Sequence, residues 1–100
     1  MQLDLKNYSA DAVLESYKFI LKQYLGGLLA GMDACLSYPT TYIFKEVCIE
    51  IRNQYIQKNN VEIEIQLVEK KIASQLHSLS GKPLTIITQF IDELIKQSKQ

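Results

Sequence analysis

The sequence predicts an all-α fold, a compact bundle of four to five helices, and three observations support this. Apolar residues recur at spacings of three and four over most of the 100 residues, which is typical of amphipathic helices. Glycine and proline interrupt this pattern at only a few places. Residues that favour helix starts and stops stand at those places, at Ser9, Pro39, Gly81 and Pro83.

Length and composition predict a single domain over residues 1–100. A chain of this size ordinarily forms one core, and no linker or low-complexity segment divides it. Hydrophobic residues make up 47% of the chain, which is more than so small a domain can easily bury alone. We expect residues 1–8 and 97–100 to fray.

The first helix is expected to start after Ser9, a good N-cap residue, with Asp11 in its first turn. Glycines at Gly26 and Gly27 are expected to break or kink it, because each glycine costs a helix about 1 kcal/mol relative to alanine. Its apolar stripe consists of Val13, Leu14, Tyr17, Ile20, Leu21, Tyr24 and Leu25.

A second helix is expected to begin near residue 40, since Pro39 suits the first turn of a helix. It should stop at Asn59 and Asn60. Its apolar positions repeat every four residues, at Ile43, Val47, Ile51 and Tyr55.

Residues 61–68 alternate apolar and polar side chains, as a half-buried strand would. The alternative fold is therefore α+β, with a hairpin over residues 45–68. A helix is favoured because a stripe at helical spacing runs well past the alternation, and because Asn60 could cap it. That stripe consists of Val61, Ile65, Val68, Ile72, Leu76 and Leu79.

The last helix is expected to follow Gly81 and Pro83, since glycine favours a helix stop and proline a helix start. Its apolar face consists of Ile87, Phe90, Ile91, Leu94 and Ile95.

The charge balance argues against a nucleic-acid partner. Eleven basic residues face eleven acidic ones, and Arg52 is the only arginine, so no basic stripe is available for phosphates. The alternative function, a dimeric helix-turn-helix regulator, would use the segment from Gly31 to Arg52. Its groove contacts would be Thr40, Thr41, Lys45 and Arg52.

The residue types that usually carry catalysis are sparse, so we expect no enzyme. Cys35 or Cys48 with His77 is the only candidate pair of thiol and base, and both cysteines fall on apolar stripes. These three side chains also lack the paired spacing of zinc ligands. We therefore expect no metal, no cofactor and no small-molecule substrate.

A cytoplasmic location is expected. The first eleven residues lack the apolar run of a signal peptide, and the most apolar stretch, residues 19–36, is interrupted by Lys22, Gln23 and Asp33. No membrane span is therefore expected. The two cysteines form no CxxC pair and are interpreted as reduced, buried thiols.

The function predicted from these observations is a small non-catalytic protein–protein interaction module. It would act stoichiometrically as an inhibitor or adaptor, of the immunity, antitoxin or chaperone kind, and would also form a homodimer. Tyrosines and a ridge of small residues gather in the first forty residues, and tyrosine is favoured at interfaces. The predicted partner-binding residues are Tyr17, Tyr24, Leu28, Gly31, Tyr38 and Tyr42.

Overall fold

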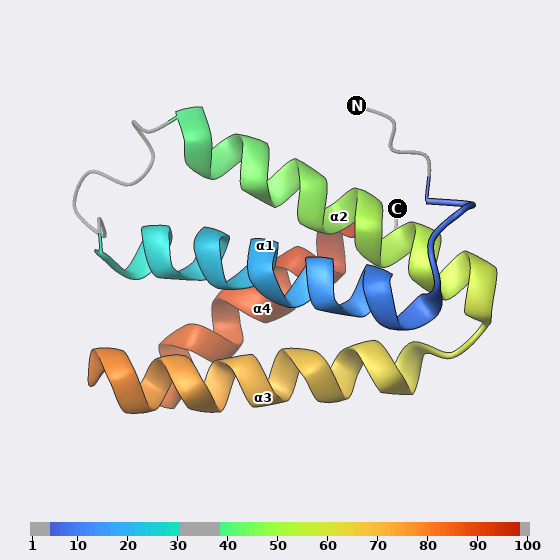
Figure 1. Cartoon of the computed structure of the whole chain (residues 1–100). Helices are drawn as coiled ribbons and strands as arrows, with labels where there is room; N and C mark the ends of the chain where they lie inside the picture. The colour runs from blue at the N-terminus through green and yellow to red at the C-terminus, as the bar shows by residue number, and fades with distance from the viewer. Residues whose placement is uncertain (1–4, 31–38, 99–100) are drawn as a thin grey trace.

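Four α-helices make up the protein, in a computed structural model that describes residues 5–30 and 39–98. In chain order they are α1 (Ala10–Ala30), α2 (Pro39–Asn59), α3 (Glu62–Ser80) and α4 (Leu84–Ser98) (Figure 1). The all-α prediction is confirmed. The hairpin alternative over residues 45–68 is wrong, because these residues belong to α2 and α3 and the connection between them.

Each of α1 and α4 packs against both α2 and α3. Helices α2 and α3 contact one another only slightly, so α1 and α4 connect them. Figure 1 shows α1 and α3 running in the same direction along the bundle and α2 running in the opposite direction, with α4 crossing between α3 and α2. The core is apolar over most of its length, and its most deeply buried aliphatic side chains are Leu21, Leu25, Ile65, Ile72, Ile87 and Leu94.

Helix α1 starts as predicted and ends later than predicted. The Oγ atom of Ser9 accepts a hydrogen bond from the Ala12 backbone N–H at 3.2 Å, which caps the helix. The expected break at Gly26 and Gly27 does not occur, because α1 continues to Ala30. Leu25 and Leu28 are buried on either side of the glycines, and this packing outweighs the weak helix propensity of glycine.

The connection between α2 and α3 shows Asn60 in a role other than the predicted one. Helix α2 stops at Asn59 as predicted, and Asn60 takes a left-handed conformation with φ 53°. Its N–H donates to the Ile56 carbonyl oxygen at 2.8 Å, so Asn60 closes α2 instead of capping α3. The N-cap position of α3 is occupied by Val61, which makes no side-chain capping bond.

The turn from α3 to α4 is as predicted. Gly81 lies in the left-handed region with φ 69°, and its N–H donates to the His77 carbonyl oxygen at 3.1 Å. Pro83 directly precedes α4 and accepts a hydrogen bond from the Ile86 N–H. Residues 97 and 98, which we expected to fray, belong to α4, and Ser98 is buried.

Two glycines are expected to respond to alanine substitution with opposite signs. Gly81→Ala should lower the free energy of unfolding by about 1–2 kcal/mol, because a Cβ atom is strained at positive φ. Gly26→Ala should raise it by about 0.5–1 kcal/mol, because Gly26 is helical and a Cβ atom there would meet nothing within 4 Å. Urea unfolding followed by circular dichroism measures both; a loss of stability in Gly26→Ala would contradict the continuous α1.

Candidate functional site

The residues predicted to bind a partner are, where they are described, part of the core. Tyr17, Tyr24 and Leu28 are buried. Their spacing of seven and four does place them on one helix face, but that face points into the bundle and also carries Leu21. They present no surface to a partner in this fold.

The other three predicted residues cannot be placed in the same way. Gly31 and Tyr38 lie outside the described residues. Tyr42 belongs to α2, but its side chain lies outside the described part of the chain.

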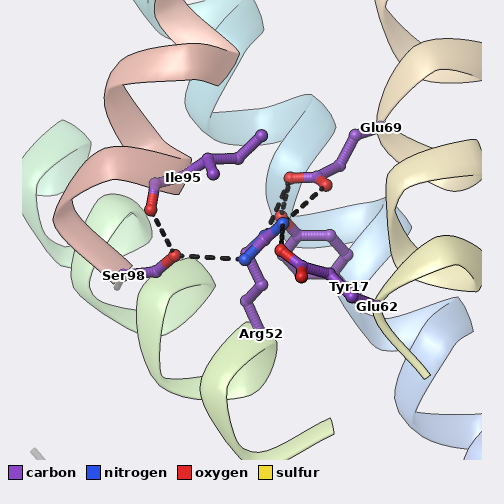
Figure 2. Close-up of polar contacts among 6 residues, drawn as sticks. All are labelled: Tyr17, Arg52, Glu62, Glu69, Ile95 and Ser98. Atoms are coloured by element: carbon purple, nitrogen blue, oxygen red, sulfur yellow. Dashed lines mark hydrogen bonds and ion pairs between the residues drawn. The ribbon is translucent and has the colours of Figure 1, made fainter. Parts of the chain in front are cut away.

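A charged pair lies at the centre of the bundle, where the four helices meet. Arg52 of α2 is 1% exposed and Glu69 of α3 is 2% exposed. The Nε atom of Arg52 donates to Glu69 Oε2 at 3.2 Å, and its Nη2 atom donates to Glu69 Oε1 at 3.3 Å. This fork geometry uses both oxygens of the carboxylate and is the strongest form of such a pair (Figure 2).

Three further side chains complete this pair into a network that joins all four helices. The hydroxyl of Tyr17, on α1, donates to Glu69 Oε2 at 2.9 Å. Arg52 Nη1 donates to the Oγ atom of Ser98, on α4, at 3.2 Å, and Ser98 Oγ donates to the Ile95 carbonyl oxygen. Arg52 Nη2 also contacts Glu62 Oε1 at 3.4 Å, at the edge of the bundle (Figure 2).

Each buried polar side-chain atom of the network has a hydrogen-bond partner. Among the described residues, no buried side-chain nitrogen or oxygen lacks a hydrogen-bond partner. Figure 2 shows Tyr17 of α1, Glu62 and Glu69 of α3, and Ser98 of α4 gathered around Arg52. A fully satisfied buried network favours one packing of the helices over others, because any other packing would leave a charge without a partner.

Burial and pairing act in opposite directions on the pKa values of this network. Burial lowers the pKa of Arg52. The hydrogen bonds and the charge of Glu69 raise this pKa by more than burial lowers it, so the net shift is upward. Burial raises the pKa of Glu69 more than Arg52 and Tyr17 lower it. The pKa of Tyr17 is raised well above its ordinary value, first by burial and then by the charge of Glu69.

This network has the residue types of an active site and the environment of a structural element. Both carboxylate oxygens of Glu69 are occupied by Arg52, and the guanidinium is enclosed by Glu62, Glu69 and Ser98. Catalytic acids and bases must reach a substrate. Arg52 and Glu69 are covered on all sides by the bundle, so we assign them a structural role.

Sequence reasoning missed this network, although a signal was present. Arg52 follows Ile51 on the buried side of α2, and it was interpreted as a groove contact of a DNA-binding segment. In this fold it is not available for phosphate contact. Glu69 lies four residues after Ile65 and three before Ile72, both buried. A charged residue inside an apolar stripe indicates a buried partner of opposite sign.

The candidate thiol and base are not brought together. Cys48 is a free thiol that is completely buried in α2, whereas His77 is exposed at the end of α3. The Nδ1 atom of His77 lies 2.6 Å from the Lys82 carbonyl oxygen, and it donates there because the carbonyl can only accept. Burial, and then the charge of Glu69, raises the pKa of the Cys48 thiol to about 12. The thiolate that nucleophilic catalysis needs is therefore disfavoured at Cys48.

Cys48 is expected to resist alkylation in the folded protein. Its pKa lies above that of an unfolded thiol, so the neutral form predominates until the pH approaches 12. In a Cys35→Ser background, iodoacetamide at pH 8 should label Cys48 at least about a hundredfold more slowly in buffer than in guanidinium chloride. Mass spectrometry of timed samples measures this, and similar labelling rates in both conditions would contradict a buried Cys48.

Within residues 5–30 and 39–98, no group of three His, Cys, Asp or Glu side chains could hold a metal ion. Among the same residues, no helix combines the length and apolar character needed to cross a membrane.

A hollow of about 740 Å³ lies between the N-terminal segment, α1 and the C-terminal half of α2. Its floor includes Val13 and Tyr55. Its two charged groups on α2 already make hydrogen bonds within the protein: Glu50 accepts from Gln54 at 2.8 Å, and Lys58 Nζ donates to two backbone carbonyl oxygens of the N-terminal segment. We therefore assign this hollow no ligand.

Among the described residues, exposed aliphatic side chains occur at Ile43 and Val61 and in pairs at two further places on the surface. We call Ile63 and Leu67, which are 68% and 59% exposed, the outer α3 face. We call Leu79 and Leu84, which are 85% and 44% exposed on either side of the Gly81 turn, the α3–α4 corner. Apolar side chains gathered on a surface mark interaction sites, whereas scattered ones need no explanation.

The α3–α4 corner is held by hydrogen bonds. Ser80 Oγ donates to the Leu76 carbonyl oxygen at 2.6 Å and accepts from the Lys82 N–H at 3.2 Å. The bonds from Gly81 N–H and from the His77 ring, described above, fix the same turn. Leu79 and Leu84 are therefore presented from a fixed backbone.

Comparisons of this chain with protein-family profiles, with curated protein sequences and with solved structures find no match.

Proposed function

We propose that the protein is a small, non-catalytic protein–protein interaction module that binds its partner stoichiometrically through the α3–α4 corner. The observation that carries this proposal is the exposure of Leu79 and Leu84 from a turn fixed by hydrogen bonds. Fully burying a leucine side chain contributes about 1.5–3 kcal/mol, and a fixed backbone reduces the entropy lost on binding. An inhibitor or adaptor of the immunity, antitoxin or chaperone kind would work in this way.

The positions of the reactive groups support a binding role over a catalytic one. Arg52 and Glu69 are committed to one another inside the bundle, and Cys48 is buried with a raised pKa. A cytoplasmic location belongs to the same proposal, since Cys48 is a free thiol.

The proposal is tested by placing a photo-crosslinking amino acid at position 79 in cells that make the chain naturally. The control places the same amino acid at position 89, where Gln89 is exposed on α4. A partner docked at the corner is expected to crosslink from position 79 and not from position 89. Equal crosslinking from both positions, or none from position 79, would overturn the proposed site.

The crosslinked protein is then purified and titrated against the chain by calorimetry. A stoichiometric module gives a fixed molar ratio, and Leu79→Asp is expected to weaken binding at least about tenfold because it places a charge in an apolar contact. The matched variant Gln89→Asp should bind like the unmodified chain. Unchanged affinity in Leu79→Asp would contradict the proposal.

A further inference from the structure

Helix α3 is apolar on two opposite faces. Ile65 and Ile72 are buried toward the bundle, whereas Ile63 and Leu67 are 68% and 59% exposed. Each residue of a helix turns by about 100°, so Ile63 and Ile65 lie about 200° apart. The alternation of residues 61–68, which resembles a strand, therefore places aliphatic side chains on both sides of a helix.

The outer α3 face has its two aliphatic side chains one turn apart, four residues along the same side of the helix. The exposed side of a surface helix ordinarily carries polar residues. An aliphatic pair at this spacing is the pattern with which one helix packs on another.

The charged residues beside this face are acidic before Leu67 in the sequence and basic after it. Glu64 precedes Leu67, and Lys70 and Lys71 follow it, all three exposed. Neither lysine makes an ion pair among the described residues. The Tyr55 hydroxyl donates to Glu64 Oε2, which holds this carboxylate at the edge of the face.

We propose that the outer α3 face is a dimer interface, on which α3 of a second copy of this chain packs antiparallel with a two-fold axis at Leu67. In this arrangement Leu67 meets its own symmetry mate. The turn of the helix places Glu64 on the same side of the interface as the second copy's Lys71, and Ile63 against the aliphatic stem of the second copy's Lys70. The contacts of Glu64 and of Ile63 each occur twice, as two-fold symmetry requires.

Charge selects the antiparallel orientation and selects a second copy as the occupant. A parallel arrangement would leave Glu64 beside the second copy's Ile63, without a lysine, and would bring Lys71 beside the second copy's Lys70, which is repulsive. The antiparallel arrangement places each Glu64 beside a Lys71 of the other copy. The surface is thus complementary to itself.

The interface is small and the dimer is correspondingly weak. Helix α3 has 19 residues and is about 28 Å long. A contact along one side of such a helix falls at the lower end of specific interfaces, for which micromolar dissociation constants are usual. The interface uses a different surface from the α3–α4 corner, so it does not depend on the proposed partner.

Sedimentation velocity of the full chain from 1 µM to 1 mM tests the proposal. A reversible monomer–dimer equilibrium is expected, and Leu67→Glu should weaken it at least about tenfold by placing like charges on the two-fold axis. Phe19→Glu, a matched change at an exposed residue of α1, should leave the equilibrium unchanged. Circular dichroism establishes that both variants keep their helix content.

A charge exchange and a cysteine pair test the orientation and the register. Lys71→Glu should weaken the dimer, and adding Glu64→Lys should restore it. In a Cys35→Ser background, Leu67→Cys should form a disulfide-linked dimer on mild oxidation. Ser74→Cys should not, because Ser74 lies on the same helix but two turns from the axis.

A chain that stays monomeric to 1 mM would overturn the proposal, and so would an unchanged equilibrium in Leu67→Glu. A partner of another sequence on this face would give the monomeric result. Disulfide formation by Ser74→Cys as fast as by Leu67→Cys would overturn the antiparallel register.

Discussion

Replacing Glu69 by alanine is expected to lower the free energy of unfolding by about 3–5 kcal/mol, a large share of the stability of a domain of this size. The reason is that Arg52 would remain 1% exposed in the bundle with its main counter-charge removed. Tyr17 would also lose the acceptor of its hydroxyl. Guanidinium chloride unfolding, followed by circular dichroism at 222 nm, measures the loss.

The control for this prediction is Glu62→Ala. Glu62 contacts the same guanidinium, but its side chain is 37% exposed and the contact distance is 3.4 Å. Water can replace it, so the expected loss is at most about 1 kcal/mol. Equal losses in Glu69→Ala and Glu62→Ala would contradict the central position of Glu69.

The second large effect is expected on α3, where two isoleucines two residues apart should differ sharply. Ile65→Ala should lower the free energy of unfolding by about 2–5 kcal/mol, because Ile65 is fully buried and its truncation leaves a cavity. Ile63→Ala should change it by no more than about 0.5 kcal/mol, because Ile63 is 68% exposed. The same denaturation experiment, at a protein concentration low enough to keep the chain monomeric, measures both.

This comparison decides between the two interpretations of residues 61–68. In a strand, side chains two residues apart share a face, so Ile63 and Ile65 would be buried or exposed together. In helix α3 they lie on opposite faces. Similar losses in the two variants would contradict the helix.

Most of the fold could be predicted from local patterns. The N-cap at Ser9, the end of α2 at Asn59 and the turn at Gly81 depend on residues close in sequence. The apolar stripes at spacings of three and four predicted the helices that lie between these ends. Helix over strand for residues 61–68 was correct because the stripe through Ile65 and Ile72 extends past the alternation.

The errors in the fold have two causes: contacts distant in sequence outweigh local preference at Gly26 and Gly27, and two local roles of asparagine compete at Asn60. Gly26 and Gly27 remain helical because the leucines around them pack against other helices. Asn60 has the residue type of an N-cap, but it adopts the left-handed conformation that closes α2. Propensity alone does not distinguish these outcomes.

Among the residues predicted to bind a partner, the three whose side chains are described, Tyr17, Tyr24 and Leu28, lie in the core. Tyr17 was interpreted as an interface residue because tyrosine is common there, but its hydroxyl donates to the buried Glu69. The seven-residue spacing of Tyr17 and Tyr24 shows that they share a helix face, but a face that binds a partner and a face that packs in the core have the same spacing. Which side of a helix meets other helices depends on the bundle as a whole, and the exposed aliphatic pair on α3 emerges only once Ile65 is placed inside.

The pair of Arg52 and Glu69 holds the four helices in one arrangement, and a double-mutant cycle measures how strongly the two side chains are coupled. The free energies of unfolding of Arg52→Met, Glu69→Leu and the double variant are compared with that of the unmodified chain. Each single variant leaves one buried charge, so the losses should not add, and a coupling of about 2–3 kcal/mol is expected, with the double variant more stable than either single one. Losses that add to within about 0.5 kcal/mol would contradict the claim.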